Sequence, residues 1–288
     1  MKVGTWRECR FLHIFEVRKE NSMIDLAVKA ALEAGAYLKE SVGKVLQIER
    51  KFGQETNLVT EIDKKSEEII ISTIRKKFPD HDFLAEESGS HDKNSEFRWI
   101  IDPLDGTLNF THGVPLYSIS IALERSGEIV TGVVYEPNLE ELFTAEKGKG
   151  AFLNKKPIRV SRVEKLIESM LVTGFPYTIR ENPLNAVEHF VNMLMSAQGL
   201  RRLGSAAVDL CYVACGRFEG FWEVSLSPWD MAAGVLLVEE AGGRFSDFSG
   251  SPSTVYTKQV LATNGLVHDK MVEILKLGLE GKLLTSRS

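Results

Sequence analysis

Several features that direct a chain to particular classes of protein are scarce or missing in this sequence. No apolar run approaches the roughly 20 residues that a membrane-spanning helix needs. Excess positive charge is missing too, because the formal net charge is −5 at pH 7 and the pI is about 5.8. Binders of nucleic acid or of anionic membranes usually carry a basic patch. We therefore expect neither nucleic acid nor a membrane among the partners.

Cysteine is also scarce, with 3 in 288 residues. Cys211 and Cys215 stand four apart in a helical pattern with no histidine near them, which makes a poor metal site. None of the 6 histidines has another histidine at ligand spacing. We expect reduced, buried thiols, which are typical of a cytoplasmic protein.

The first 22 residues have no clear period and no targeting signal. The apolar stretch 11–15 is too short for the hydrophobic part of a signal peptide, and acidic residues flank it. A strongly helical stretch opens at Met23. We therefore expect an N-terminal extension over 1–22 and a fold that starts near Met23.

The apolar period changes along the rest of the chain, which predicts two halves of different architecture. The half 23–155 is predicted to hold two helices and then hairpin-linked strands, which favours an antiparallel sheet. The half 156–288 mixes strands with apolar helices, which favours an α/β arrangement with a mixed sheet. No flexible linker or repeat separates the halves. The predicted helices are 24–42, 60–78, 185–198, 206–215 and 231–241, and the predicted strands are 81–85, 97–101, 117–123, 129–135, 142–145, 148–152, 170–173 and 218–222.

The string DPLDGTLNF, residues 102–110, places two acids where an apolar strand ends. Asp102 and Asp105 would point to opposite faces of a regular strand, because their spacing is odd. Pro103 is therefore predicted to end the strand and start a turn. In that turn both carboxylates and the Leu104 carbonyl could meet a hard cation such as Mg²⁺. An Asp-rich turn that only caps a helix is the alternative.

The next two residues suit an anion. Gly106 allows close approach of the backbone to a ligand, and Thr107 can begin a short helix whose amides face phosphate. A phosphatase with an aspartate nucleophile would instead carry D-x-D-G-T. Here the spacing is one residue longer and Pro103 takes the place of that nucleophile, so this interpretation is rejected.

Four more acids stand at the ends of predicted strands or at the starts of predicted helices, and each also has a structural explanation. Glu86 and Glu87 could lie in a solvated loop after a strand. Asp230 could be the N-cap of a helix, and Asp63 could form a capping box with Thr60. Taken together, acids at such positions are typical of metal–phosphate sites.

With these residues in view, the sequence resembles the inositol monophosphatase family from about Met23 to about Leu275. The resemblance implies Mg²⁺-dependent hydrolysis of inositol and sugar phosphates on a layered α-β-α-β-α fold. It rests on four segments, which are LAEES (84–88), WIIDPLDGTLNF (99–110), GSAAVDLCYVACGRFEGFWE (204–223) and PWDMAAGVLLVEEAGG (228–243).

The resemblance also implies roles for individual residues. One Mg²⁺ is expected on Glu86, Asp102 and the Leu104 carbonyl, a second on Asp102, Asp105 and Asp230, and a third, weaker ion near Glu86 through water. Catalytic roles are expected for Asp63, Glu86 and Thr107. Glu87 is expected to support the ion ligands without binding an ion itself. Substrate contacts are expected from Asp105, Gly106, Thr107, Gly204, Ser205, Ala206 and Glu223. Glu223 is expected to accept hydrogen bonds from ring hydroxyls. The alternative interpretation of Glu223 is an exposed acid at the end of a strand.

The chain departs from the family pattern in two places. Ala85 replaces the usual glycine before the acid pair, and the loop after Lys51 leaves the register of the family's lysine open.

The resemblance further implies lithium inhibition and a homodimer. Fructose 1,6-bisphosphate, 3′-phosphoadenosine 5′-phosphate or another sugar phosphate stay open as substrates. A regulatory role on RNA or the transcription machinery also stays open, with the pair Arg201–Arg202 as its one hint.

Overall fold

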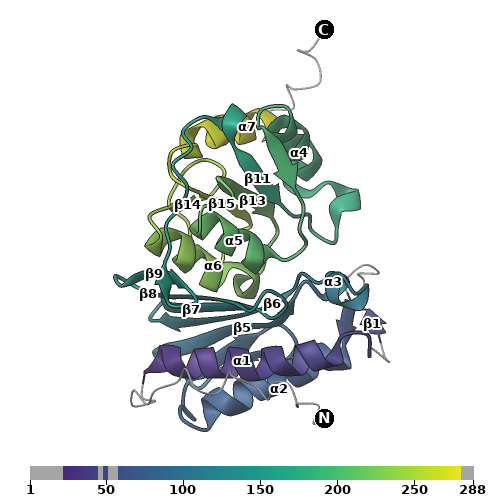
Figure 1. Ribbon diagram of the computed structural model, residues 1–288, viewed down its shortest axis with the longest axis vertical. Coiled ribbons are helices and arrows are strands. Elements are labelled where there is room, and N and C mark those ends of the chain that lie inside the picture. Colours follow the sequence, from purple (N-terminus) through teal and green to yellow (C-terminus); the bar gives the residue numbers. More distant parts are fainter. Residues whose placement is uncertain (1–21, 45–47, 51–57, 280–288) are drawn as a thin grey trace, which may run out of the picture.

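The computed structural model describes residues 22–44, 48–50 and 58–279. The expected extension, apart from Ser22, lies outside the described residues, and so do Cys9 and Lys51. The described residues form two large β-sheets and three helical layers that alternate along the longest axis of the molecule (Figure 1). Residues 48–50 and 58–60 form a separate, two-stranded antiparallel sheet.

The N-terminal half supplies the larger sheet and the helices that cover its outer face. Its elements are α1 Met23–Ser41, β1 Ile48–Arg50, β2 Leu58–Thr60, α2 Glu61–Arg75, β3 Asp82–Ala85, β4 Gly89–His91, β5 Phe97–Asp105, α3 Thr107–Thr111, β6 Ser118–Arg125, β7 Glu128–Glu136, β8 Glu141–Glu146 and β9 Gly150–Leu153. The short strand β10 Lys156–Pro157 follows the expected boundary at residue 155 but joins the same sheet.

The C-terminal half supplies the smaller sheet and the remaining helices. Its elements are a 3₁₀ turn Leu166–Glu168, β11 Met170–Thr173, two 3₁₀ turns Ile179–Glu181 and Pro183–Asn185, α4 Ala186–Leu194, β12 Gly199–Arg201, α5 Ala206–Ala214, β13 Gly220–Val224, α6 Pro228–Glu240, β14 Arg244–Ser246, β15 Gln259–Thr263 and α7 His268–Leu279.

Helix α1 shows why the first layer lies close to the sheet. The Ser22 side chain caps its start by accepting a hydrogen bond from the Asp25 amide at 3.2 Å. An alanine-rich stripe is fully buried, so the helix approaches the sheet closely. A Cβ at Gly35 would lie 2.5 Å from the Tyr135 ring, which leaves room for glycine only. The predicted stop at Gly43 is confirmed by a left-handed φ of +75°.

The larger sheet runs in the order β10-β9-β8-β7-β6-β5-β3-β4. All its neighbouring strands are antiparallel except β3 and β5, which are parallel. Helices α1 and α2 cover one face, and α5 and α6 cover the other (Figure 1). The central strand β6 is consequently buried on both faces over 118–124 and does not alternate between core and solvent.

The smaller sheet runs in the order β12-β11-β13-β15-β14. Strand β11 is parallel to both its neighbours, whereas β15 is antiparallel to both of its own. Helices α5 and α6 lie between the two sheets, and α4 and α7 form the outermost layer (Figure 1). The predicted layered α-β-α-β-α sandwich, with a mixed sheet in its C-terminal half, is confirmed. The expected antiparallel sheet of the N-terminal half is wrong in one place, because β3 and β5 are parallel and make the larger sheet mixed as well.

Several predicted element boundaries were wrong. Helix α2 ends at Arg75, three residues early, and α4 covers 186–194 instead of 185–198. Strand β13 covers 220–224, so Glu223 lies inside the strand. Helix α6 starts at Pro228 because proline suits the first turn, where its missing N–H costs nothing.

The structure also bears on the state of the cysteines and on the length and polarity of the helices. Cys211 is buried and Cys215 half-buried, and both are free thiols. Over the described ranges, the helices are all too short or too polar to cross a membrane.

Candidate active site

A β-bulge in β5 brings Asp102 and Asp105 to the same side of the sheet. Asp102 pairs with Ser120 of β6, and Asp105 pairs with Ser118. Three steps along β5 therefore match two steps along β6, which means that β5 carries one extra residue. Residues two apart on a strand share a face, so the bulge turns an odd spacing into an even one.

The bulge corrects the prediction that Pro103 ends the strand. The strand continues through Pro103 to Asp105. Proline has no N–H to donate to the ladder and is tolerated in a sheet at a bulge. Its carbonyl is used, because the buried Ser66 hydroxyl donates to it at 2.8 Å.

Glu86 lies beside Asp102 because their strands are parallel. Ala85 is paired with Ile101, and Glu86 and Asp102 are the next residues along. The Glu86 amide donates to the Ile101 carbonyl at 3.1 Å. Glu86, directly after β3, and Asp102, within β5, thus lie side by side.

Asp105 is held by the start of α5, across the boundary between the two halves. Its Oδ2 accepts from the Ser205 hydroxyl at 2.6 Å and from the Ala207 amide at 2.8 Å. The Ser205 hydroxyl is also 3.2 Å from that of Ser118 and caps α5 through the Val208 amide. Predicted residues from both halves therefore meet here.

Thr107 connects the bulge to α2. Its hydroxyl lies 2.9 Å from Asp63 Oδ1 and 3.0 Å from the Leu104 carbonyl oxygen. Gly106 precedes it with a φ of +96°, and α3 begins at Thr107 as predicted. A Cβ at Gly106 would lie 3.2 Å from the Gly204 and Leu116 carbonyl oxygens.

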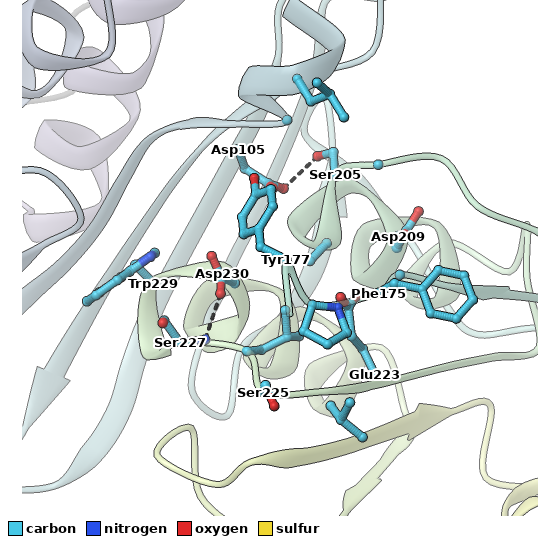
Figure 2. Close-up of a pocket in the computed structure, with 18 of the residues that line it drawn as sticks. Asp105, Phe175, Tyr177, Ser205, Asp209, Glu223, Ser225, Ser227, Trp229 and Asp230 are labelled. Atoms are coloured by element: carbon cyan, nitrogen blue, oxygen red, sulfur yellow. Dashed lines mark hydrogen bonds between the residues drawn. The ribbon is translucent and has the colours of Figure 1, made fainter. Parts of the chain in front are cut away.

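Asp230 is the third residue of α6, so the alternative interpretation of Asp230 as the N-cap is wrong. Ser227 is the N-cap, and its amide donates to Asp230 Oδ2 at 2.6 Å. Figure 2 shows this bond and the Ser205–Asp105 bond on facing sides of the site. Within the described part of the chain, the hydrogen bonding of the Asp230 carboxylate is confined to Oδ2, which leaves Oδ1 for a ligand.

The site acids raise one another's pKa. Burial first, and then the charge of Glu86 and the other acids, hold the pKa of Asp102 well above its ordinary value. Burial raises the pKa of Asp105 to about 6. Burial, Glu86 and Asp105 raise that of Asp230. Such mutual repulsion in a dry site is relieved by cations bound between the carboxylates.

The acids open onto a cleft of about 600 Å³ between the two halves. Of the predicted site residues, those that line it are Glu86, Asp105, Gly106, Gly204, Ser205, Ala206, Glu223 and Asp230. The others lie buried directly behind this lining, and they are Asp63, Asp102, Leu104 and Thr107. Among the described lining residues, Arg202 is the single basic side chain.

Glu223 lies on β13 inside the cleft and is not the exposed acid of the alternative interpretation. Only 7% of its surface is exposed, and burial raises its pKa to about 8. A Cβ at Gly174 would lie 2.6 Å from its carboxyl carbon, so glycine leaves the room that this acid occupies.

Asp209 and Tyr177 are polar lining residues that the sequence analysis did not predict. Asp209 of α5 is 1% exposed, and its Oδ1 has no hydrogen-bond partner within the described part of the chain. A lone acid in the apolar run AAVDLCYVA was the available signal. Tyr177 lies on the loop after β11 and points toward Asp105 (Figure 2). No sequence pattern marks it.

The carboxylates of the site are chemically suited to a hard cation, since carboxylate oxygens are the ligands that Mg²⁺ prefers. Within the residues that the structure describes, no three acidic, histidine or cysteine side chains already converge as ion ligands. One oxygen of Asp105 and one of Asp230 are held by protein donors. The acids therefore line a shared space without closing on one point.

Comparison with known proteins places this chain among phosphatases. The profile of the inositol monophosphatase family matches residues 19–277. The chain is 44% identical over 263 residues to an inositol-1-monophosphatase of Synechocystis sp., covering 91% of each chain. It is 41% identical over 249 residues to a Nus factor SuhB of Pseudomonas aeruginosa, covering 84% of this chain and 91% of that protein.

Solved structures agree with these relatives. The extragenic suppressor protein SuhB of Bartonella henselae superposes with a TM-score of 0.83 at 41% identity, covering 88% of this chain and 97% of that one. The Thermotoga maritima IMPase also has a TM-score of 0.83, at 38% identity, covering 89% and 98%.

Proposed function

Since the chain belongs to the inositol monophosphatase family and is a phosphatase, we propose that it releases phosphate from inositol 1-phosphate or a related sugar phosphate in a Mg²⁺-dependent reaction. The observation that carries this proposal is the set of four acids, Glu86, Asp102, Asp105 and Asp230, around one cleft. The raised pKa values of Asp102, Asp105 and Asp230 favour occupation by cations.

The proposed ion ligands follow the arrangement of the acids. Glu86, Asp102 and the Leu104 carbonyl would hold one Mg²⁺, and Asp102, Asp105 and Asp230 a second, with a third near Glu86 through water. When bound, such ions lower the pKa of water and neutralise phosphate and the leaving alkoxide. Asp102 would be the ligand shared by the two ions, which is supported by its place beside Glu86 and by the bulge that brings it to the same side of the sheet as Asp105.

The protein's own groups would orient the attacking water. The Thr107 hydroxyl donates toward Asp63, so its oxygen can accept a proton of water and turn a water lone pair toward phosphorus. Asp63 is buried and placed to take up that proton through Thr107. Transfer is direct to water, and no aspartate attacks phosphorus.

The cleft would position both ends of the substrate. The Gly106 and Thr107 amides are proposed to face phosphate. Glu223 is proposed to accept hydrogen bonds from ring hydroxyls, and Gly204, Ser205 and Ala206 to border the ring. Holding the ester in line with the water would supply much of the rate enhancement.

A substrate panel tests the proposal. Purified protein is assayed for phosphate release from inositol 1-phosphate, fructose 1,6-bisphosphate and 3′-phosphoadenosine 5′-phosphate, with Mg²⁺ or with EDTA. We expect Mg²⁺-dependent release that is fastest from inositol 1-phosphate. Faster release from either of the other two would reassign the substrate, and no metal-dependent release from any ester would refute the proposal.

A regulatory function on RNA or the transcription machinery is a second candidate. It is favoured by relatives named Nus factor SuhB at 41% identity and by the exposed pair Arg201–Arg202. Capture of transcription components by the wild type, lost when both arginines are changed to alanine, is the expected result. Equal capture by both proteins would argue against this role for the pair.

The remaining proposals concern the oligomeric state, the location in the cell, lithium inhibition and the division of the chain into halves. Helix α4 exposes Val187, Val191 and Leu194 on one face, and its C-cap Met195 is also exposed, which supports a homodimer formed through this helix. The free thiols Cys211 and Cys215 support a cytoplasmic location. Lithium inhibition is proposed at the acid cluster. The division into halves 23–155 and 156–288 is kept as a proposal, with the cleft between them.

A further inference from the structure

Helix α2 presents three buried polar residues to the back of the active site. Asp63, Ser66 and Glu67 are 1%, 0% and 4% exposed. Their spacing of three and four residues places them on one face of the helix. A stripe of buried polar groups needs partners, and here the partners are all segments of the site.

Each of the three residues reaches a different segment. Asp63 pairs with Thr107, and Ser66 donates to the Pro103 carbonyl inside the bulge. Glu67 Oε2 accepts from the Glu87 amide at 2.8 Å, and its Oε1 accepts from the Ser88 amide at 2.9 Å. Both carboxylate oxygens of Glu67 are therefore occupied by consecutive backbone amides.

Those amides belong to the turn that follows Glu86. On one side Glu86 is tied to β5 through its own amide, which donates to the Ile101 carbonyl at 3.1 Å. On the other side the backbone is tied to α2 by Glu67. A charge-assisted, two-point contact of this kind is strong and fixes direction.

We infer that Glu67 is a positioning residue for the metal site: its carboxylate clamps the turn 87–88 and thereby holds Glu86 in place to receive a cation. This inference rests on the proposed function, because it requires Glu86 to be an ion ligand. Glu67 does not line the cleft, so it would act only through the turn.

The chemistry of the clamp distinguishes a carboxylate from its isosteric amide. In Glu67→Gln one acceptor oxygen becomes an NH₂ group that faces a backbone N–H, so one hydrogen bond is lost and two donors meet. Glu67→Asp keeps the charge but shortens the reach by one methylene. Glu68→Gln is the matched control, since Glu68 is the next residue, is exposed and pairs with Lys65 on the surface.

The experiment measures Mg²⁺ binding by calorimetry on full-length wild type and the three variants, without substrate. We expect Glu67→Gln to raise the Mg²⁺ dissociation constant about tenfold, in the range found for groups that support metal ligands. Glu67→Asp should lie between it and wild type, and Glu68→Gln should match wild type. At saturating Mg²⁺ the kcat of Glu67→Gln should return to within about threefold of wild type, because a positioning defect is repaired by ion occupancy.

Unchanged Mg²⁺ affinity in Glu67→Gln would overturn the inference, and so would an equal loss in Glu68→Gln. If Glu67→Gln does not fold, amide exchange on the metal-free wild type decides instead. We expect slow exchange at Glu87 and Ser88, and exchange as fast as in an open loop would overturn the clamp. A wild type without Mg²⁺-dependent activity would refute the proposed function instead, whatever the exchange shows.

Discussion

Replacing Glu223 with glutamine should change how the stability of the protein depends on pH. The pKa of Glu223 is about 8 in the folded protein, against an ordinary 4.5, because the side chain is buried. The folded state therefore binds this proton more tightly than the unfolded state does. The resulting stabilisation is fully present below pH 4.5 and is lost as pH rises through 8.

The size of the effect follows from the two pKa values. The difference between 8 and 4.5 corresponds to at most about 5 kcal/mol across that pH range. Glu223→Gln keeps the shape of the protonated acid and cannot ionise. Its free energy of unfolding should match wild type at pH 5 and exceed it by several kcal/mol at pH 9.

Urea denaturation at pH 5, 7 and 9 in EDTA measures this difference, with fluorescence and circular dichroism compared to check that unfolding is two-state. EDTA removes metal ions that would alter nearby charges. Glu68→Gln is the control, because this exposed acid should leave the pH dependence unchanged. Parallel stability curves for wild type and Glu223→Gln would show that Glu223 is not buried as a neutral acid.

Three further substitutions test other contacts. Gly174→Ala should push the Glu223 carboxylate aside and raise the KM for inositol 1-phosphate about tenfold. Hydrolysis of p-nitrophenyl phosphate, which has no polyol, should stay nearly as fast as in wild type. Equal losses on both esters would refute this role of Glu223. Asp63→Asn should lower kcat about 100-fold with little change in melting temperature, and a wild-type kcat would exclude a role in activating water. Gly132→Ala places a Cβ 2.8 Å from the Ala233 carbonyl oxygen where β7 meets α6. This clash should lower the free energy of unfolding by about 1–3 kcal/mol. Unchanged stability would mean that β7 and α6 move apart easily.

The layered fold was predictable because its helices and strands carry clear periods. The alanine stripe of α1 and the strand over 170–173 were both predicted within about a residue. The resemblance to a family then supplied the order of the layers, which local periodicity does not contain.

The bulge was not predictable from local pattern. Pro103 ordinarily argues against a continuing strand, so a turn was the reasonable expectation. Pairing with Ser118 and Ser120 overrides that preference, and those partners lie more than a dozen residues away in the sequence.

Asp230 shows a signal that was present in the sequence. Ser227, Pro228 and Asp230 stand at the N-cap, first-turn and third positions that commonly start a helix. Reading them together would have placed the start of α6 correctly. The clamp by Glu67 differs, because it joins residues 20 apart through backbone amides, which no side-chain pattern records.

Asp102 is proposed to be shared between cations that the four acids hold. The most direct measurement is Mg²⁺ titration of wild type and Asp102→Asn by calorimetry, with phosphate release from inositol 1-phosphate measured on the same samples. We expect wild type to bind Mg²⁺ and turn over, and Asp102→Asn to fold but lose at least about 100-fold in both affinity and kcat, because one substitution removes a ligand from two ions. Full Mg²⁺ binding and full activity in Asp102→Asn would contradict the account.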